Sequence, residues 1–172
     1  GTFMNDYVSN YGADVVTKAW DIVHATREKV RRLINAKESH EIAFVKNTAE
    51  GISELAMGLN LRPGENVVIA DQEHQSTLFP WINAHQQKGI ELKVVKSDEN
   101  REIPLQDVID AIDSKTRVVM VSSVQFSTGF ATDLKTLGAV CRKKGVIFAV
   151  DGIQSLGRLK IDVQEFNIDY LA

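Results

Sequence analysis

Four short segments of the sequence carry polar side chains of types that could do chemistry. They are Asn47–Gly51, Asp71–His74, Ser122–Gly129 and Asp151–Gln154. A helix start suits an anion, a histidine can stack on a flat ligand or move a proton, and a carboxylate can hold a cationic nitrogen. Each segment follows a short apolar run, and ligands of open α/β sheets bind beyond the carboxyl ends of the strands. We therefore expect the chemistry of this chain at that end of a sheet.

Each of these segments also has a purely structural interpretation. Thr48 can cap a helix whose first N–H groups suit a phosphate, but no Walker lysine and no G-x-G-x-x-G accompany it, so a simple helix start is the alternative. His74 could merely satisfy a loop. Asp151 follows the apolar run Ile147–Val150, and a buried carboxylate needs a partner. A cationic ligand nitrogen would supply that partner, and a structural ion pair or helix cap is the alternative.

The elements that must position these segments alternate along the chain. Apolar spacing predicts helices over 14–36, 50–59, 76–88, 105–112 and 134–141. We expect Gly89 and Gly145 to end the third and the fifth of these helices. Short apolar runs predict strands over 42–46, 67–70, 92–95, 117–122 and 146–150, with another beginning at 169. Such alternation implies βαβ units with right-handed crossovers and a mainly parallel sheet.

Composition excludes several classes of protein. The chain has 172 residues, 44% of them hydrophobic and 25% charged, as in globular domains. A net charge of -3 leaves no electrostatic footprint for nucleic acid. The single cysteine excludes an internal disulfide framework and a four-cysteine zinc site, and we expect no metal. Cys141 lies in an apolar helical stripe, so we expect it in the core. No apolar run approaches the roughly 20 residues of a membrane span. The first residues, GTFMNDY, lack the charged start and the apolar core of a secretory signal. We expect a cytoplasmic domain that binds neither nucleic acid nor membrane.

Taken together, the segments resemble the large domain of the class V aminotransferases. This is the branch of fold-type I pyridoxal-phosphate enzymes that includes cysteine desulfurases, selenocysteine lyases and isopenicillin-N-epimerase-like proteins. The resemblance runs from about Tyr11 to Ala172. It rests on F-V-K-N-T-A-E-G-I at 44–52, E-H-Q-S-T-L-F-P-W at 73–81, V-Q-F-S-T-G-F at 124–130 and V-D-G-I-Q-S-L-G at 150–157.

The resemblance implies a three-layer α/β/α fold with a mainly parallel sheet, incomplete at both ends. It implies one domain over 1–172, with a helical lead over 1–40 and a cofactor-binding part over 41–172, and without the family's small C-terminal domain. The lysine that forms the Schiff base in the family would come after Ala172. We therefore expect a fragment of a longer enzyme that is inactive by itself.

The resemblance also implies roles for individual residues toward pyridoxal 5'-phosphate. Thr48, Ala49 and Glu50 match the loop that holds the cofactor phosphate. His74 matches the residue that stacks on the pyridine ring, and Asp151 matches the carboxylate that pairs with the ring nitrogen. The remaining two expected cofactor contacts are Gln154, which matches the side chain bonded to the phenolic oxygen, and Gln125 in the polar loop after the fourth strand.

The resemblance leaves more than one activity open. The parent protein is expected to act on an amino acid as a homodimer, with carbon–sulfur cleavage of a cysteine-like substrate as the first choice. Many desulfurases have Asn where this chain has Phe126, which favours epimerisation or transamination as the second choice. A naturally truncated binding or assembly module is a third hypothesis, of a different class. A flavodoxin-like nucleotide-binding domain fits the alternating pattern but none of the four segments.

Overall fold

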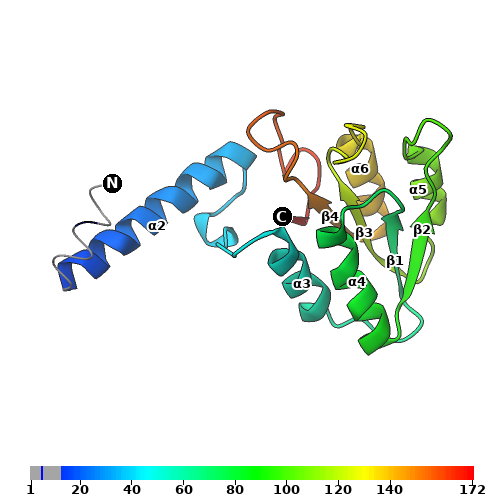
Figure 1. Cartoon of the computed structure of the whole chain (residues 1–172), viewed down its shortest axis with the longest axis horizontal. Coiled ribbons are helices and arrows are strands. Elements are labelled where there is room, and N and C mark those ends of the chain that lie inside the picture. The colour runs from blue at the N-terminus through cyan, green and yellow to red at the C-terminus, as the bar shows by residue number, and fades with distance from the viewer. Residues whose placement is uncertain (1–4, 6–12) are drawn as a thin grey trace. The chain divides into compact units, whose positions relative to one another are not determined.

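Five parallel strands form one sheet in the computed structural model, which describes Asn5 and residues 13–172. Their order in the sheet is β2-β1-β3-β4-β5 (Figure 1). The strands are β1 Asn66–Ala70, β2 Glu91–Val95, β3 Thr116–Ser122, β4 Ile147–Asp151 and β5 Tyr170–Leu171. All four neighbouring pairs are parallel, as the alternating pattern predicted.

Helices cover both faces of the sheet, which confirms the predicted three-layer fold. They are α3 Thr48–Gly58, α4 Gln75–Lys88, α5 Leu105–Ala111 and α6 Leu134–Lys144. Successive strand residues point to opposite faces, so Val67 packs in a core cluster with α3 and α4, whereas Val68 packs in a second cluster with α5 and α6. Cys141 belongs to the second cluster and is completely buried, as predicted.

Two glycines end the helices that lead back into the sheet. Gly89 after α4 and Gly145 after α6 both adopt left-handed backbone, with φ of 68° and 67°. Glycine reaches this conformation at no steric cost and so ends a helix sharply. Both had been predicted from the sequence as helix ends.

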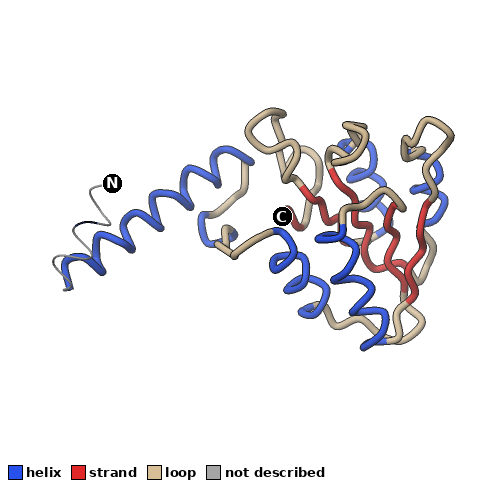
Figure 2. Tube along the Cα trace, in the orientation of Figure 1, coloured by secondary structure: helices blue, strands red, loops and turns tan. Residues whose placement is uncertain are grey.

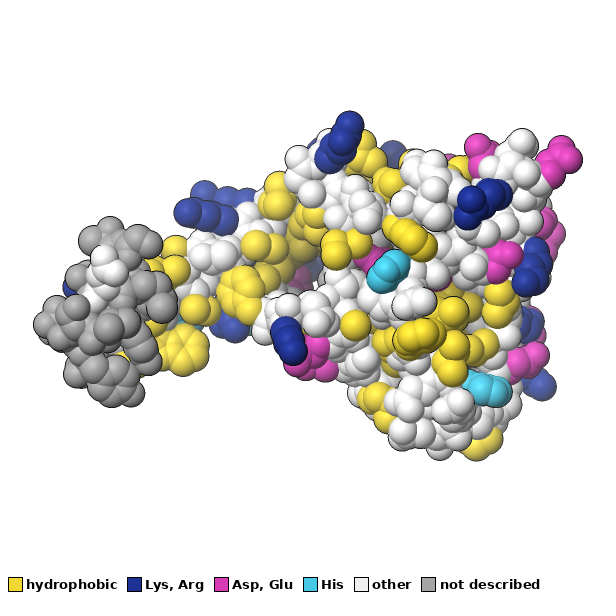
Figure 3. All heavy atoms as spheres, in the orientation of Figure 1, with side chains coloured by type: hydrophobic (Ala, Val, Ile, Leu, Met, Phe, Trp, Pro, Cys, Tyr) yellow, Lys and Arg dark blue, Asp and Glu magenta, His cyan; other side chains and the backbone are white. Residues whose placement is uncertain are grey.

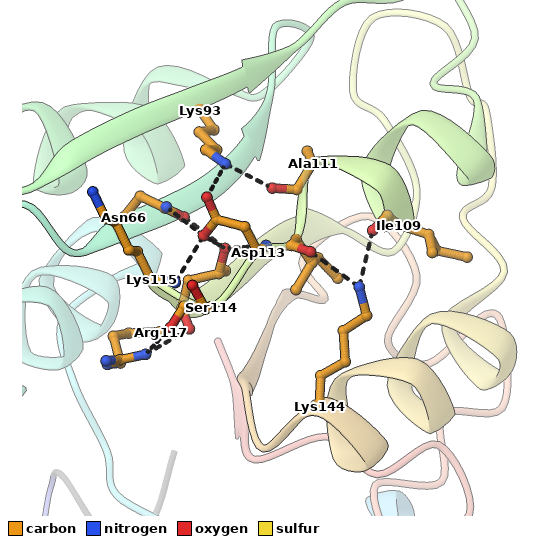
Figure 4. Close-up of polar contacts among 11 residues, drawn as sticks. Asn66, Lys93, Ile109, Ala111, Asp113, Ser114, Lys115, Arg117 and Lys144 are labelled. Carbon is orange, nitrogen blue, oxygen red and sulfur yellow. Dashed lines mark hydrogen bonds and ion pairs between the residues drawn. The ribbon is translucent and has the colours of Figure 1, made fainter.

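A polar cluster joins neighbouring strands at the end of the sheet where they begin (Figure 4). Nζ of Lys93, on β2, donates a 2.7 Å bond to Oδ2 of Asp113, and Nδ2 of Asn66, on β1, donates a 3.0 Å bond to Oδ1. The hydrogen bond from Lys93 lowers the pKa of Asp113 below its ordinary value, with the bond from Asn66 as the next cause. Lys144 reaches the carbonyl of Ile109 at 3.5 Å from the other side. Asp113 thus has its partners within the cluster. The cluster lies at the opposite end of the strands from the predicted site.

The predicted strand over 42–46 is wrong. The chain divides into two compact units between Phe44 and Val45, so this segment straddles the division. Within the described residues the segment joins no sheet, because its backbone finds no strand partner there. Phe44 and Val45 are 51% and 41% exposed. A strand depends on a neighbouring strand for its hydrogen bonds, and an apolar run alone does not provide one.

The first unit contains α2 Ala13–Ile34 and the short 3₁₀ helix η1 Ser39–Glu41. α2 matches the predicted helix over 14–36 to within two residues at its carboxyl end. Residues 1–4 and 6–12 of the predicted helical lead lie outside the described residues. In the part of the chain that is described, no helix combines the length and the apolar character that crossing a bilayer requires.

Candidate functional site

The loops that follow β1, β3 and β4 gather at one end of the sheet (Figure 2). β3 and β4 end side by side, because Ser122 and Asp151 are partners in the parallel register. The N–H of Ser123 then donates a 2.8 Å bond to the carbonyl of Asp151. Three of the four predicted segments therefore meet where a parallel α/β sheet places its ligands.

Asp151 lies at the end of β4 with only 2% of its surface exposed. Its Oδ2 accepts a 2.7 Å bond from the hydroxyl of Thr77, and its Oδ1 accepts a 3.0 Å bond from the N–H of Ile153. Both donors are neutral, so the negative charge meets no cation among these contacts. A carboxylate offers about four acceptor positions, and Asp151 can accept a further bond from a ligand.

His74 begins α4 and is exposed to solvent. Its Nδ1 accepts a 3.1 Å bond from the N–H of Ser76 and lies 2.8 Å from the Ser76 hydroxyl. An accepting Nδ1 leaves the proton of the neutral ring on Nε2. The ring of Phe126 meets the His74 ring nearly at right angles, with centroids 4.8 Å apart. The imidazole is thus held in one orientation at the surface.

The start of α3 is capped by Asn47, not by Thr48 as predicted. Oδ1 of Asn47 accepts a 2.9 Å bond from the N–H of Glu50, and the Glu50 carboxylate in turn accepts a bond from the N–H of Lys46. This arrangement differs from a capping box, because the carboxylate accepts from the residue before the cap and not from the cap itself. Thr48 becomes the first helical residue. The N–H groups of Thr48 and Ala49 have no intrahelical acceptor, whereas the N–H of Glu50 is already occupied.

A hollow of about 420 Å³ opens between α3 and α4. Ala49 and Ser53 line it from α3, and His74 and Phe79 line it from α4. Two of the predicted cofactor-binding residues, Ala49 and His74, therefore face a common space although 25 positions separate them in the sequence.

Glu73 is a buried carboxylate that the sequence analysis did not identify. It is 6% exposed and accepts bonds from the N–H and the hydroxyl of Ser122 and from Nε2 of Gln125. Burial raises the pKa of Glu73, and the bonds from Ser122 and Gln125 act against that rise. Glu73 therefore ties the loop after β1, which carries His74, to the loop after β3. Its position directly before His74 was the only signal in the sequence.

The two predicted glutamines occupy different environments. Gln125 is 1% exposed, and its Nε2 donates a 2.8 Å bond to Oε1 of Glu73. It does not line the hollow beside His74. Gln154 is exposed in the turn after β4. The hydroxyl of Ser155, which lies 2.6 Å from that of Ser123 and donates to the Gly152 carbonyl, anchors this turn.

Metal ligands do not gather anywhere in the described part of the chain: no three His, Cys, Asp or Glu side chains there are placed to hold an ion. The chemistry available at the strand ends is that of an acceptor carboxylate, an oriented imidazole and a helix start.

Comparison with protein families matches residues 2–172 to the family described as aminotransferase class-V. The chain belongs to this family. A probable cysteine desulfurase of Methanothermobacter thermautotrophicus is 35% identical over 176 residues, which cover 98% of this chain and 44% of that protein. The chain thus spans less than half the length of this class V relative.

Two solved structures share the fold of this chain. The apo cysteine desulfurase of Thermococcus onnurineus NA1 is 27% identical, with a TM-score of 0.88 over 99% of this chain and 44% of that one. A variant of C-DES with glycine covalently linked to its pyridoxal-phosphate cofactor is 21% identical, with a TM-score of 0.90 over 99% of this chain and 46% of that one. This chain therefore has the fold of fold-type I enzymes over about half of their length.

Proposed function

We propose that this chain forms the pyridoxal-phosphate-binding part of an enzyme that acts on an amino acid. The observation that carries the proposal is the buried Asp151 carboxylate at the end of β4, linked through Thr77 to the helix that His74 begins. Asp151 and His74 lie on loops at one end of the sheet, and the start of α3 lies across the hollow from His74. Together they fit the three parts of this cofactor: its ring nitrogen, its ring and its phosphate.

The phosphate group would lie at the start of α3. The N–H groups of Thr48 and Ala49 are available there, and the helix dipole favours negative charge at this end. The Thr48 hydroxyl can add a third donor. The N–H of Glu50 would contribute only if it gave up its bond to Asn47, so we assign the phosphate first to Thr48 and Ala49.

Asp151 would hold the ring nitrogen, and His74 would lie against the ring. A bound pyridoxal phosphate supplies an electron sink for a carbanion at the substrate α-carbon. Asp151 supports that chemistry because its charge favours a protonated ring nitrogen. Thr77 and the N–H of Ile153 keep the carboxylate oriented while leaving acceptor positions open. Gln154, exposed in the adjoining turn, is assigned to the phenolic oxygen on the family resemblance.

Carbon–sulfur cleavage of a cysteine-like substrate is the reaction we assign first. Its support is the match to a probable cysteine desulfurase at 35% identity. The residues that read the substrate are expected mainly outside this chain, so the test requires a protein of the relatives' length that contains it. Incubation with pyridoxal phosphate and L-cysteine should yield alanine and transferable sulfur.

Epimerisation or transamination is the second candidate, favoured by Phe126. Its ring lies against His74 and is 52% exposed, which places an apolar surface at the site. In the same assay a D-amino acid would indicate epimerisation, and a keto acid formed without released sulfur would indicate transamination.

We also infer a homodimer that works in the cytoplasm and binds no nucleic acid. Apolar side chains are exposed over α4 (Figure 3) and in the turns after β4, where Ile153 is 64% and Leu159 is 50% exposed. Such surfaces favour association with another protein. Analytical ultracentrifugation of the chain measures its oligomeric state, and a monomer at all concentrations would contradict the dimer for this part of the protein.

Cofactor binding is tested on the chain itself with pyridoxine 5'-phosphate. This compound lacks the aldehyde and so forms no adducts with surface lysines. We expect heteronuclear NMR shifts to gather at Thr48, Ala49, His74 and the turn after Asp151. Pyridoxine without the phosphate is the control and should bind more weakly, with the shifts at Thr48 and Ala49 lost. Shifts spread over the surface, or equal binding of both compounds, would contradict the proposal.

A further inference from the structure

Two buried carboxylates lie at the carboxyl ends of the strands, and the proposed function uses only one of them. Glu73, in the loop after β1, is 6% exposed, and Asp151, at the end of β4, is 2% exposed. β3 lies between β1 and β4 in the sheet. Its last residue, Ser122, donates its N–H and its hydroxyl to Glu73 and is the register partner of Asp151. Neighbouring strands lie about 4.8 Å apart, so the two carboxyl groups share one small region at the end of the sheet.

The segments around the two carboxylates supply no positive charge. Residues 118–132, which form most of β3 and the loop after it, contain no charged side chain and no histidine. Residues 146–157, which form β4 and the turn after it, contain Asp151 as their one charged side chain. The donors bonded to Glu73 and Asp151 are hydroxyls, backbone N–H groups and one amide, all of them neutral. Two negative charges would therefore lie near each other here without a compensating cation.

The other titratable and charged groups of the surrounding elements have other partners. His74 is bonded through Nδ1 within the first turn of α4, and Asp133 caps α6. Asp71, on the loop that also carries Glu73, accepts a bond from a backbone N–H of the loop after β2. That loop contributes Lys96, which lies 3.8 Å from Asp71, and Arg101, which donates to the amide side chain beside Asp71. Within the described residues, none of these groups bonds to either buried carboxylate.

The absence of a cation determines how the pair is charged. A buried negative charge without a positive partner is costly, and a second one nearby adds repulsion that a single proton removes. Burial is the main cause that raises the pKa of Glu73, and the negative charge of Asp151 raises it further. Glutamate also ordinarily holds its proton more tightly than aspartate. Glu73 is therefore the member of the pair that takes the proton.

We propose that Glu73 is a positioning residue of this site that acts through Asp151: Glu73 holds a proton, Asp151 alone carries the negative charge, and a cation bound to Asp151 loosens the proton on Glu73. A neutral Glu73 confines the negative charge to one place, so a cationic ligand atom is directed to Asp151. Once that atom compensates the charge of Asp151, less repulsion opposes the ionised form of Glu73, and its proton passes more readily to solvent. This last step rests on the proposed function, in which the ring nitrogen is the cation.

The experiment on the pair needs no cofactor. Carbon NMR of the isotope-labelled chain follows the Glu73 carboxyl group with pH, and Glu73→Gln identifies its signal by removing it. In Asp151→Asn the midpoint of the Glu73 titration should move to lower pH, because the nearby charge is gone and the shape is kept. Glu99→Gln is the matched control, since it removes one negative charge from an exposed position, where solvent screens it, and should leave the midpoint unchanged. An unchanged midpoint in Asp151→Asn, or equal shifts in both variants, would overturn the pair.

Pyridoxine 5'-phosphate tests the link to the cofactor. At saturation it should move the midpoint of Glu73 in the original chain to lower pH, whereas inorganic phosphate, which carries no cation, should not. An unchanged midpoint with the ligand bound would overturn the link between Asp151 and Glu73 in the occupied site. If the ligand does not bind, the proposed function fails and the link to the cofactor fails with it. The comparison of the free chain with Asp151→Asn still decides the charged pair in that case.

Discussion

The hydroxyl of Thr77 donates a 2.7 Å hydrogen bond to Oδ2 of Asp151, across 74 positions of sequence. Thr77 is completely buried, and Asp151 is 2% exposed. The bond fixes the first turn of α4 to the end of β4. His74 caps that turn, so a single contact holds the aromatic ring and the carboxylate of the proposed site in one frame. In the proposed function this frame determines where the cofactor ring can lie.

Glu73 should make the stability of the chain depend on pH. Burial raises its pKa from the ordinary value of 4.5, so the protonated carboxyl favours the folded state. This contribution is complete below about pH 4.5 and is lost as the pH rises through the folded pKa. Relative to Glu73→Gln, the original chain should therefore lose free energy of unfolding as the pH increases. Urea denaturation of both proteins at several pH values measures the difference.

Glu73→Leu is the companion variant, because it removes the acceptors of Ser122 and Gln125 altogether. It should lower the free energy of unfolding by about 2–4 kcal/mol, since several donors stay buried without partners. A constant difference between the original chain and Glu73→Gln at every pH would exclude a raised pKa at this position.

Lys88 should stabilise the end of α3. Its Nζ donates to the carbonyls of Ala56, Met57 and Leu59 at 3.0, 2.7 and 2.7 Å. These acceptors lie at the end of the helix that lacks intrahelical donors and carries the negative pole of the dipole. Lys88→Met should lower the free energy of unfolding by about 1–2 kcal/mol. Lys115→Met, at an exposed lysine, should change it by less than about 0.5 kcal/mol; equal effects of the two would refute the assignment.

Gly138 should tolerate no side chain. A Cβ at this position of α6 would lie 1.8 Å from the carbonyl oxygen of Phe166, which is backbone and cannot rotate away. Gly138→Ala should therefore destabilise the chain by at least about 2 kcal/mol in thermal or urea unfolding. Gly58→Ala is the control within α3, where a Cβ meets nothing within 4 Å; it should be neutral or stabilise by up to about 1 kcal/mol. Comparable losses in both would contradict this packing.

Cys141 should be chemically silent in the folded chain. Burial raises the pKa of its thiol to about 12, and the thiolate is the reactive form. An aromatic disulfide reagent at about pH 8 should therefore react only in denaturant, with one equivalent of thiol released. Rapid reaction of the native chain would show that α6 opens easily from the sheet.

The alternating apolar pattern predicted β1 to β5 and the helices α3 to α6 well, because each of these strands has a parallel partner in the sheet. The pattern failed over 42–46, where the apolar run is typical of a strand but no strand among the described residues pairs with it. A strand is a property of two segments, and a pattern read along one segment does not contain its partner. The helix ends at Gly89 and Gly145 were predicted because their cause is local.

Individual residues of the candidate site could be predicted only where their position along the sequence indicated a role. Asp151 and His74 stand at strand ends, which the parallel-sheet rule singles out. Glu73 was missed because its importance comes from Ser122 and Gln125, 49 and 52 positions later. Gln125 was expected at the cofactor, and in the fold its Nε2 donates a hydrogen bond to Glu73; its role toward the cofactor stays a prediction.

The central claim is that Asp151 holds the ring nitrogen of the cofactor. The pKa of this nitrogen in a bound ligand tests that claim most directly. Pyridoxine 5'-phosphate carrying an isotope label at this nitrogen is titrated with pH when free, when bound to the original chain and when bound to Asp151→Asn. The bound ring should have a higher pKa than the free ligand in the original chain, because the Asp151 carboxylate stabilises the protonated nitrogen. That increase should vanish in Asp151→Asn. An unchanged ring pKa on binding, or the same increase in both proteins, would contradict the assignment of Asp151 and with it the proposed site.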